Sequence, residues 1–155
     1  MYTRGRQVKL ILSRMEEFTS TTCRHPTKIH IRNAVSNDGR IIGREITVVY
    51  SGGAYSVAGN VTVRNAVYAI SSVYNIPNVR AEIYRVYTNQ LQGGAFRGFG
   101  STQVYWAIES QMGEVARRLE IDLIVLRQKN ILGNGQKSCI GELLTDDTME
   151  LCHKI

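Results

Sequence analysis

The stretch HPTKIHIRNAVSNDGRIIGREITVVY, residues 25–50, carries the strongest fold signal in the chain. Polar and apolar residues alternate through its first half, residues 25–36, as they do on a strand with one buried face. Its second half, residues 40–50, is rich in β-branched residues, which favour strands. Asn, Asp and Gly occupy positions 37–39 between the two halves, and these residue types tolerate the backbone angles of a tight turn. The stretch therefore predicts a β-hairpin.

Two signals precede the hairpin. Residues 8–12 form a short apolar run, which is typical of a buried strand. Ser13 and Glu16 have the spacing of a capping box, in which each side chain binds a free backbone N–H at the start of a helix. A short helix is therefore expected to run to about residue 19. Glu16 and Glu17 are interpreted as a helix cap and a surface charge rather than as catalytic acids.

The chain after the hairpin contains further helical and strand-like segments. Asn60 is placed to cap a helix over residues 61–73, and alternating polarity predicts a strand over residues 79–88. Ser101 is placed to cap a long helix that ends near residue 119. The buried stripe of that helix is expected to comprise Val104, Ile108, Met112, Val115 and Leu119.

Asp122 is placed to cap a further helix through residue 130, and residues 145–155 have weak helical character. This order of a hairpin, helices and single strands favours an α+β fold, a two-layer architecture with helices packed on a mixed sheet. A chain of 155 residues, 43% of them hydrophobic, suffices for one core. A single domain over residues 1–155 is therefore expected.

Composition limits the classes of partner. No apolar run approaches the roughly eighteen residues of a membrane span, and no signal peptide opens the chain, so a cytoplasmic protein without a membrane partner is expected. The net charge is +6, but Lys28, His30 and Arg32 alternate with isoleucines as on a solvated strand face. No nucleic-acid partner is expected from them. Cys23 and His25 are interpreted as a buried thiol beside a surface histidine.

The stretch QGGAFRGFGSTQ, residues 92–103, carries the functional signal. Glycines let a backbone approach a ligand closely, and the start of the following helix favours an anion. Arg97 adds a permanently charged, forked donor, while Phe96 and Phe99 add aromatic rings. Composition alone leaves two interpretations open, which are a site for a flat or anionic ligand and a hinged loop with phenylalanine anchors.

The segment GAFRGFG, residues 94–100, resembles a segment of the xanthine dehydrogenase/aldehyde oxidase family, in its large, molybdopterin-binding subunit. Weaker similarities follow in the same order along almost the whole chain, at residues 5–9, 13–17, 25–26, 38–40, 52–55, 74–79, 86–89 and 126–130. Members that act on purines carry a substrate-binding arginine at the position of Asn65, so the substrate class stays open between purines, other heteroaromatics and aldehydes.

The resemblance implies a set of site residues. Gly94, Ala95, Phe96 and Arg97 would bind a molybdenum–molybdopterin cofactor, with Arg97 near the metal but not ligating it. Phe99 would lie against a planar substrate. No catalytic residue is assigned within the chain, because the family's glutamate base matches none of its positions.

The resemblance also implies a setting for the chain. It would be an internal, partial molybdopterin-binding domain of a molybdenum hydroxylase, which hydroxylates a heteroaromatic or aldehyde carbon with water. It would be inactive alone and share its cofactor with other segments. Its partners would be the remaining domains of the molybdopterin subunit, iron–sulfur and FAD domains or subunits, and a small-molecule substrate.

Two alternatives come from other classes of protein. A basic α+β module could stack single-stranded nucleic acid on Phe96 and Phe99 beside Arg97. A subunit-assembly domain could use the same loop against a partner protein. Basic side chains converging around both rings would favour the first alternative, whereas a loop that faces an open surface would favour the enzyme.

Overall fold

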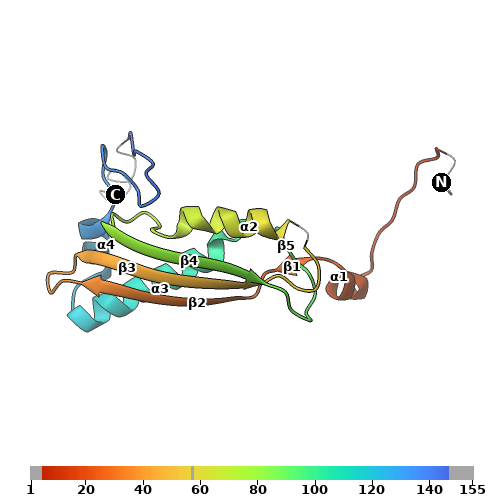
Figure 1. Cartoon of the computed structure of the whole chain (residues 1–155), viewed down its shortest axis with the longest axis horizontal. Coiled ribbons are helices and arrows are strands. Elements are labelled where there is room, and N and C mark those ends of the chain that lie inside the picture. The colour runs from red at the N-terminus through yellow and green to blue at the C-terminus, as the bar shows by residue number, and fades with distance from the viewer. Residues whose placement is uncertain (1–4, 57, 147–155) are drawn as a thin grey trace.

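The computed structural model describes residues 5–56 and 58–146 (Figure 1). Its elements in chain order are α1 (Arg14–Ser20), β1 (Cys23–Arg24), β2 (Thr27–Val35), β3 (Ile41–Ser51), α2 (Gly59–Asn65), the 3₁₀ helix η1 (Ala66–Ala69), β4 (Asn78–Val86), β5 (Gly93–Gly94), α3 (Ser101–Leu119) and α4 (Leu123–Asn130).

The sheet has three strands in the order β2-β3-β4. The β2 and β3 strands form the predicted antiparallel hairpin, with Thr27 opposite Tyr50 and a register shift between Ala34 and Val35. The β3 and β4 strands are parallel, so the sheet is mixed. A separate two-residue parallel pair joins β1 to β5.

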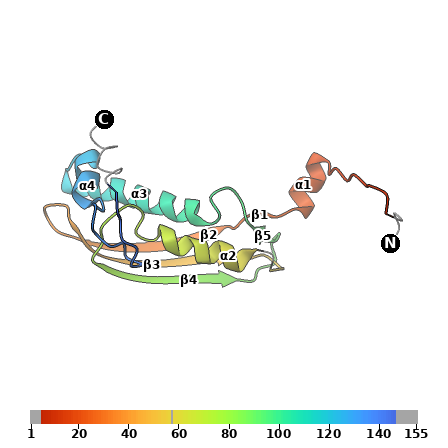
Figure 2. The same ribbon diagram turned by 90° about the horizontal axis from the view of Figure 1, so that it is seen from above.

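The α2 and α3 helices cover one face of this sheet, so the two-layer α+β prediction is confirmed. Both views place α2 and α3 on the same side, with α3 along β2 and α2 along β4 (Figures 1 and 2). The core lies between the layers. Its completely buried residues include Ile46, Val48 and Tyr50 from β3 and Val104, Ile108 and Met112 from α3. The opposite face of the sheet is exposed along β2, including Lys28, His30 and Arg32 as predicted, and half-buried along β3.

The N-terminal arm, residues 5–20, corrects one prediction. Residues 8–12 form no strand, and Val8, Leu10 and Ile11 are exposed. The arm extends away from the two layers (Figures 1 and 2). The physical reason is that a strand needs hydrogen-bonded neighbours, and no strand within the described ranges pairs with this run.

The capping box at the start of α1 is confirmed. The Glu16 backbone N–H donates to Ser13 Oγ at 3.3 Å, and the Ser13 N–H donates to Glu16 Oε2 at 2.7 Å. Hydrogen bonds from the Ser13 backbone and then its side chain lower the pKa of Glu16. Glu17 pairs with Arg14 across the exposed helix surface. Both glutamates therefore have the structural roles expected of them.

The second helix differs from its prediction. It begins at Gly59 without a side-chain cap and ends at Asn65, before the chain continues as η1. Asn60 is not the cap because it lies inside the first turn, where its Oδ1 accepts a 3.4 Å hydrogen bond from Arg85 Nη1. The helix is also shorter than predicted.

The fourth helix begins as predicted, because Asp122 Oδ1 accepts hydrogen bonds from the N–H groups of Ile124 and Val125. Residues 145–146 are not helical, and the rest of the predicted C-terminal helix, residues 147–155, lies outside the described residues. None of the helices that the structure describes is both long enough and apolar enough to cross a membrane.

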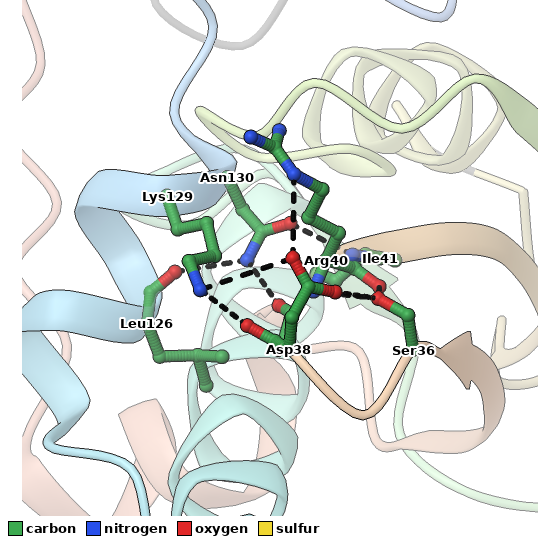
Figure 3. Close-up of polar contacts among 8 residues, drawn as sticks. Ser36, Asp38, Arg40, Ile41, Leu126, Lys129 and Asn130 are labelled. Atoms are coloured by element: carbon green, nitrogen blue, oxygen red, sulfur yellow. Dashed lines mark hydrogen bonds and ion pairs between the residues drawn. The ribbon is translucent and has the colours of Figure 1, made fainter.

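The buried side chain of Asn130 connects α4 to the hairpin turn by hydrogen bonds (Figure 3). The Asn130 Nδ2 group donates to the Gly39 and Leu126 carbonyl oxygens at 2.8 and 2.9 Å, and its Oδ1 accepts from the Ile41 N–H at 2.8 Å. Asn130 is 4% exposed. Its amide therefore satisfies three buried backbone groups from two elements that are about ninety residues apart in sequence.

Charged groups surround the same turn. Lys129 Nζ donates to the Asp38 carbonyl oxygen, and Asp38 also lies near Arg40. The pKa of Asp38 is lowered, first by the hydrogen bond from the Ser36 hydroxyl and then by the neighbouring backbone and cations. These contacts are exposed, so we expect the buried amide to contribute more to stability.

Replacing Asn130 with Ala should therefore lower the free energy of unfolding by about 1–3 kcal/mol, the cost of leaving buried polar groups unpaired. Asn134→Ala is the matched control, because Asn134 is exposed and its side chain makes no hydrogen bond to the described part of the chain. Urea unfolding of both variants measures the difference. Equal stabilities would show that the turn does not depend on this amide.

The exposed arm leads to a second prediction. Its apolar side chains Val8, Leu10, Ile11, Met15 and Phe18 are each at least 70% exposed. Such surface favours self-association. Light scattering should detect oligomers of the chain at high concentration, and Leu10→Ser/Ile11→Ser should reduce them while Lys9→Ser should not. A strictly monomeric wild-type chain would contradict this expectation.

Candidate functional site

The candidate site is the loop of residues 92–100, which contains the β5 strand and leads into the α3 helix. The β5 residues Gly93 and Gly94 are buried and pair with Cys23 and Arg24 of β1. The loop is also bound to the edge of the main sheet, because the Gly93 N–H donates to the Gly52 carbonyl oxygen at 3.0 Å. The exposed part of the loop therefore follows a strand whose backbone is hydrogen-bonded to β1 and to the main sheet.

Two glycines are required by close approach. A Cβ atom at Gly93 would lie 2.0 Å from His25 Nδ1, and one at Gly100 would lie 2.5 Å from the Thr62 carbonyl oxygen. Gly100 also has a φ of 91°, which side chains disfavour. Gly100 is the N-terminal boundary residue of α3. Because these two glycines lack side chains, the loop can pass close to β1, α2 and α3.

The prediction that Ser101 caps α3 is wrong. The Ser101 hydroxyl donates backward to the Gly98 carbonyl oxygen at 2.6 Å, and the Ser101 N–H donates to the same atom at 3.0 Å. Gly100 occupies the cap position because the chain turns there in the left-handed region. The serine closes the loop instead of capping the helix.

Phe99 is held in an unusual backbone conformation. Its φ is 49°, in the left-handed region, which costs about 1–3 kcal/mol for a residue with a side chain. Its N–H donates to the Phe96 carbonyl oxygen at 2.7 Å, and its own carbonyl oxygen accepts from Asn65 Nδ2 at 3.0 Å. Asn65, at the position where the resemblance places a substrate-binding arginine in some members, here anchors the loop.

Arg24 contacts the loop from the β1 strand. Its Nη2 donates to the Arg97 carbonyl oxygen at 2.8 Å, and its Nη1 donates to Thr102 Oγ1. Its guanidinium carbon lies 4.7 Å from the centre of the Phe96 ring, which is within cation–π range. Arg24 is absent from the predicted site residues, because no motif or spacing in the sequence connects residue 24 to the loop.

The interpretation of Cys23 and His25 is also corrected. Cys23 is exposed, and His25 is 2% exposed beneath Gly93. His25 Nδ1 lies 2.8 Å from the Ser51 carbonyl oxygen, so Nδ1 must carry the proton in that bond. The reason for the reversal is tertiary packing, because the His25 ring lies against Gly93, Tyr50 and the Ser51 carbonyl oxygen.

The predicted site residues fall into two groups. Gly94 is buried in the β5 ladder, whereas Ala95, Phe96 and Arg97 lie together on the exposed surface of the loop. Phe99 is half-buried on the side held by Asn65. The Arg97 guanidinium forms no hydrogen bond or ion pair with any residue that the structure describes.

The loop offers positive charge and N–H donors. The N–H groups of Phe96, Arg97 and Gly98 have no acceptor among the residues that the structure describes. The first turn of α3 contains no acidic residue, so its partial positive charge is not neutralised there. Such an arrangement suits oxygen anions more than metal cations. No group of three or more His, Cys, Asp or Glu side chains in the described part of the chain could hold a metal ion.

A shallow groove borders the loop on the α3 side. Its volume is about 600 Å³, and its lining includes Arg24, Pro26, Thr102 and Trp106. Trp106 is 74% exposed. The loop and the groove together form an open surface with two aromatic side chains, Phe96 and Trp106.

Comparison with known proteins identifies the family. The family model of the molybdopterin cofactor-binding domain matches residues 1–131. The chain is 36% identical over 127 residues to a probable xanthine dehydrogenase subunit of Bacillus subtilis, covering 82% of this chain and 17% of that protein. It is 34% identical over 143 residues to the nicotinate dehydrogenase large molybdopterin subunit of Eubacterium barkeri, covering 92% of this chain and 34% of that protein.

The fold is that of a solved relative. The structure of the aldehyde oxidoreductase from Desulfovibrio gigas superposes with a TM-score of 0.85 at 29% sequence identity, covering 90% of this chain and 15% of that one. The chain thus spans about a third of the length of one of these relatives and about a sixth of the other two. With a family match over residues 1–131 and the same fold in a solved relative, this chain belongs to the family of molybdopterin cofactor-binding domains.

Proposed function

We propose that this chain is the cofactor-binding part of a molybdenum hydroxylase that hydroxylates a heteroaromatic or aldehyde carbon with water. The observation that carries the proposal is the loop of residues 92–100, where the Arg97 guanidinium and three backbone N–H groups have no partner among the described residues. Two of the similar proteins are named for nicotinate, a heteroaromatic acid, and for aldehydes. Those names motivate the two substrate classes.

The residues of the loop fit molybdopterin. The group is rich in anionic oxygens, and when bound it supplies the molybdenum centre for oxygen and electron transfer. Arg97 would donate from its guanidinium to an oxygen of the cofactor, while the N–H groups of Phe96, Arg97 and Gly98 would donate from the backbone. Gly94 would keep the backbone free of a side chain at the entrance to the loop.

Substrate orientation would fall to the aromatic residues. Phe99 would present its ring to a planar substrate, and Ala95 and Phe96 would line the pocket. The bonds that Phe99 makes to Phe96 and Asn65 fix its backbone. A ring on a fixed backbone loses little conformational freedom when substrate binds, which favours affinity.

The proposal places the chain within a larger assembly. Residues 1–155 would form a partial domain that shares its cofactor with the remaining domains of the molybdopterin subunit, and iron–sulfur and FAD domains or subunits would accept the electrons. The exposed arm and the exposed Phe96 and Trp106 support neighbouring domains on these surfaces. A cytoplasmic location stays a prediction of the sequence.

The nucleic-acid alternative receives less support. Stacking of bases needs free aromatic faces, and one face of the Phe96 ring is covered by the Arg24 guanidinium. Arg24 is bound to the loop itself, so it does not converge on Phe99 as that alternative requires.

The 155-residue chain alone should be catalytically inert and hold no stoichiometric molybdenum, because no residue in it is proposed as the general base and its cofactor would be shared. Metal analysis of the purified chain and assays with nicotinate, xanthine and an aldehyde test this. Turnover of any of them by the isolated chain would refute it.

Within the full-length enzyme, Arg97→Ala should lower molybdenum content, kcat, or both, whatever the substrate. Hydrogen bonds to charged groups contribute about 1.5–3 kcal/mol, which corresponds to roughly a ten- to hundredfold loss. Arg97→Lys is the matched control, because it keeps the charge and loses the fork. Full activity and full metal content in Arg97→Ala would exclude the role at the cofactor.

Phe99→Leu in the same enzyme should leave molybdenum content near normal and reduce kcat/KM for a heteroaromatic substrate more than for an aliphatic aldehyde. The expected loss is about 0.5–1.5 kcal/mol, the contribution of aromatic pairing beyond burial. Leucine keeps apolar bulk and removes only the ring. Equal losses for both substrates, or loss of the metal, would contradict the assignment.

A further inference from the structure

We infer that Arg24 is a positioning residue for the proposed cofactor loop. It would act through Phe96, Arg97 and Thr102 and would not touch the cofactor or substrate itself. The inference rests on the proposed function only in calling the loop a cofactor loop. The positioning itself is a property of this chain and can be tested without any ligand.

The contacts of Arg24 converge on the part of the chain that would bind the ligand. One guanidinium nitrogen donates to the Arg97 carbonyl oxygen at 2.8 Å, and the other terminal nitrogen donates to Thr102 Oγ1 in the first turn of α3. The guanidinium carbon between them lies over the Phe96 ring at 4.7 Å from its centre. One side chain thus joins the ring, the backbone and the helix start.

The backbone around Arg24 is bound to residues on both sides of the exposed part of the loop. The Arg24 backbone pairs with Gly94, immediately before the exposed residues. The adjacent His25 carbonyl oxygen accepts from Gln103 Nε2 at 3.2 Å, shortly after them. The Cα of residue 24 therefore has a fixed position relative to both ends of the segment that its side chain spans.

The charge of Arg24 is not used in an ion pair. No carboxylate in the described part of the chain lies within ion-pair distance of it. Its side-chain contacts with the described residues go to the loop and the start of α3. The two guanidinium groups therefore have different roles. That of Arg24 is bound within the protein, and that of Arg97 is available to a ligand.

This division predicts a local effect. Without Arg24, the Arg97 carbonyl group and the Phe96 ring lose their partners, while the contacts between the sheet and α3 remain. The loop should open more often, and the Arg97–Gly98 bond should become accessible to trypsin. Local proteolysis follows the population of the open form when opening is fast relative to cleavage.

The experiment measures, by mass spectrometry, the initial rate of trypsin cleavage at Arg97–Gly98 in the folded 155-residue chain. Arg24→Ala should raise this rate about tenfold, as expected for two lost hydrogen bonds of ordinary strength. Arg24→Lys should stay within about threefold of Arg24→Ala, because an ammonium group cannot reach both acceptors as a planar fork does. The control Arg118→Ala, an exposed arginine that pairs with Glu114, should leave the rate unchanged.

A second variant removes the acceptor of the hydrogen bond between Arg24 and Thr102 instead of its donor. Thr102→Val removes the accepting hydroxyl while keeping Arg24, and should raise the cleavage rate about threefold. The double variant Arg24→Ala/Thr102→Val should cleave no faster than Arg24→Ala, because the hydrogen bond that Thr102→Val removes is already absent in Arg24→Ala. If Arg24→Ala does not fold, the result for Thr102→Val decides the matter.

Three results would overturn the inference. These are an unchanged cleavage rate in Arg24→Ala or Thr102→Val, wild-type protection in Arg24→Lys, and a rise in rate that the fall in global unfolding free energy, measured in urea, fully explains. None depends on a cofactor. Failure of the proposed function would appear instead in the metal content of the full-length Arg97 variants, so the two failures are distinguishable.

Discussion

One hydrogen bond connects the core of this protein to its candidate site. The Tyr50 hydroxyl, completely buried at the end of the central strand, donates to the Gly100 carbonyl oxygen at 2.6 Å. Burial raises the pKa of Tyr50 to about 12, so the phenol stays protonated and remains a donor throughout the physiological range. The exit of the loop and the start of α3 are thereby fixed to the sheet. This anchor holds the end of the loop, the β1–β5 ladder holds its start, and Asn65 and Arg24 contact the residues between them.

The direction of the strands explains why the loop lies at one edge of the sheet. The β3 and β4 strands are parallel, so their carboxyl ends, Ser51 and Val86, lie side by side. The Gly52 N–H donates to the Val86 carbonyl oxygen at 2.7 Å, and the Thr88 N–H donates to the Gly53 carbonyl oxygen at 3.2 Å. Ligands in open sheets of parallel strands commonly bind beyond this edge. The sheet thus holds the loop of residues 92–100 beyond the ends of these strands, with the side chains of residues 95–97 exposed.

The buried polar contacts that stabilise the fold lie away from the loop that is proposed to bind the cofactor. Away from the loop, the buried Arg44 donates to Asn33 Oδ1 and to the Ile70 carbonyl oxygen, and desolvation lowers its pKa to about 10. Tyr74 donates to the Glu109 carboxylate, which also accepts from Arg127 of α4. The Arg44 contacts join the sheet to the segment after η1, and the Tyr74–Glu109–Arg127 contacts join that segment to α3 and α4. In the loop, by contrast, the Arg97 guanidinium and several backbone N–H groups have no partners in the described structure.

Features that depend on neighbours along the chain could be predicted from the sequence. The hairpin followed from alternation and turn chemistry, α3 from its apolar spacing, and α4 from the Asp122 cap, since each signal lies within a few residues of the structure it specifies. Tertiary pairing was needed to establish that residues 8–12 form no strand, that His25 is buried, and that Gly100 replaces Ser101 at the helix cap. The same pairing gives Arg24 its place at the loop. Arg24 and Arg97 are 73 residues apart and meet because β1 pairs with β5, and no local pattern encodes such pairing.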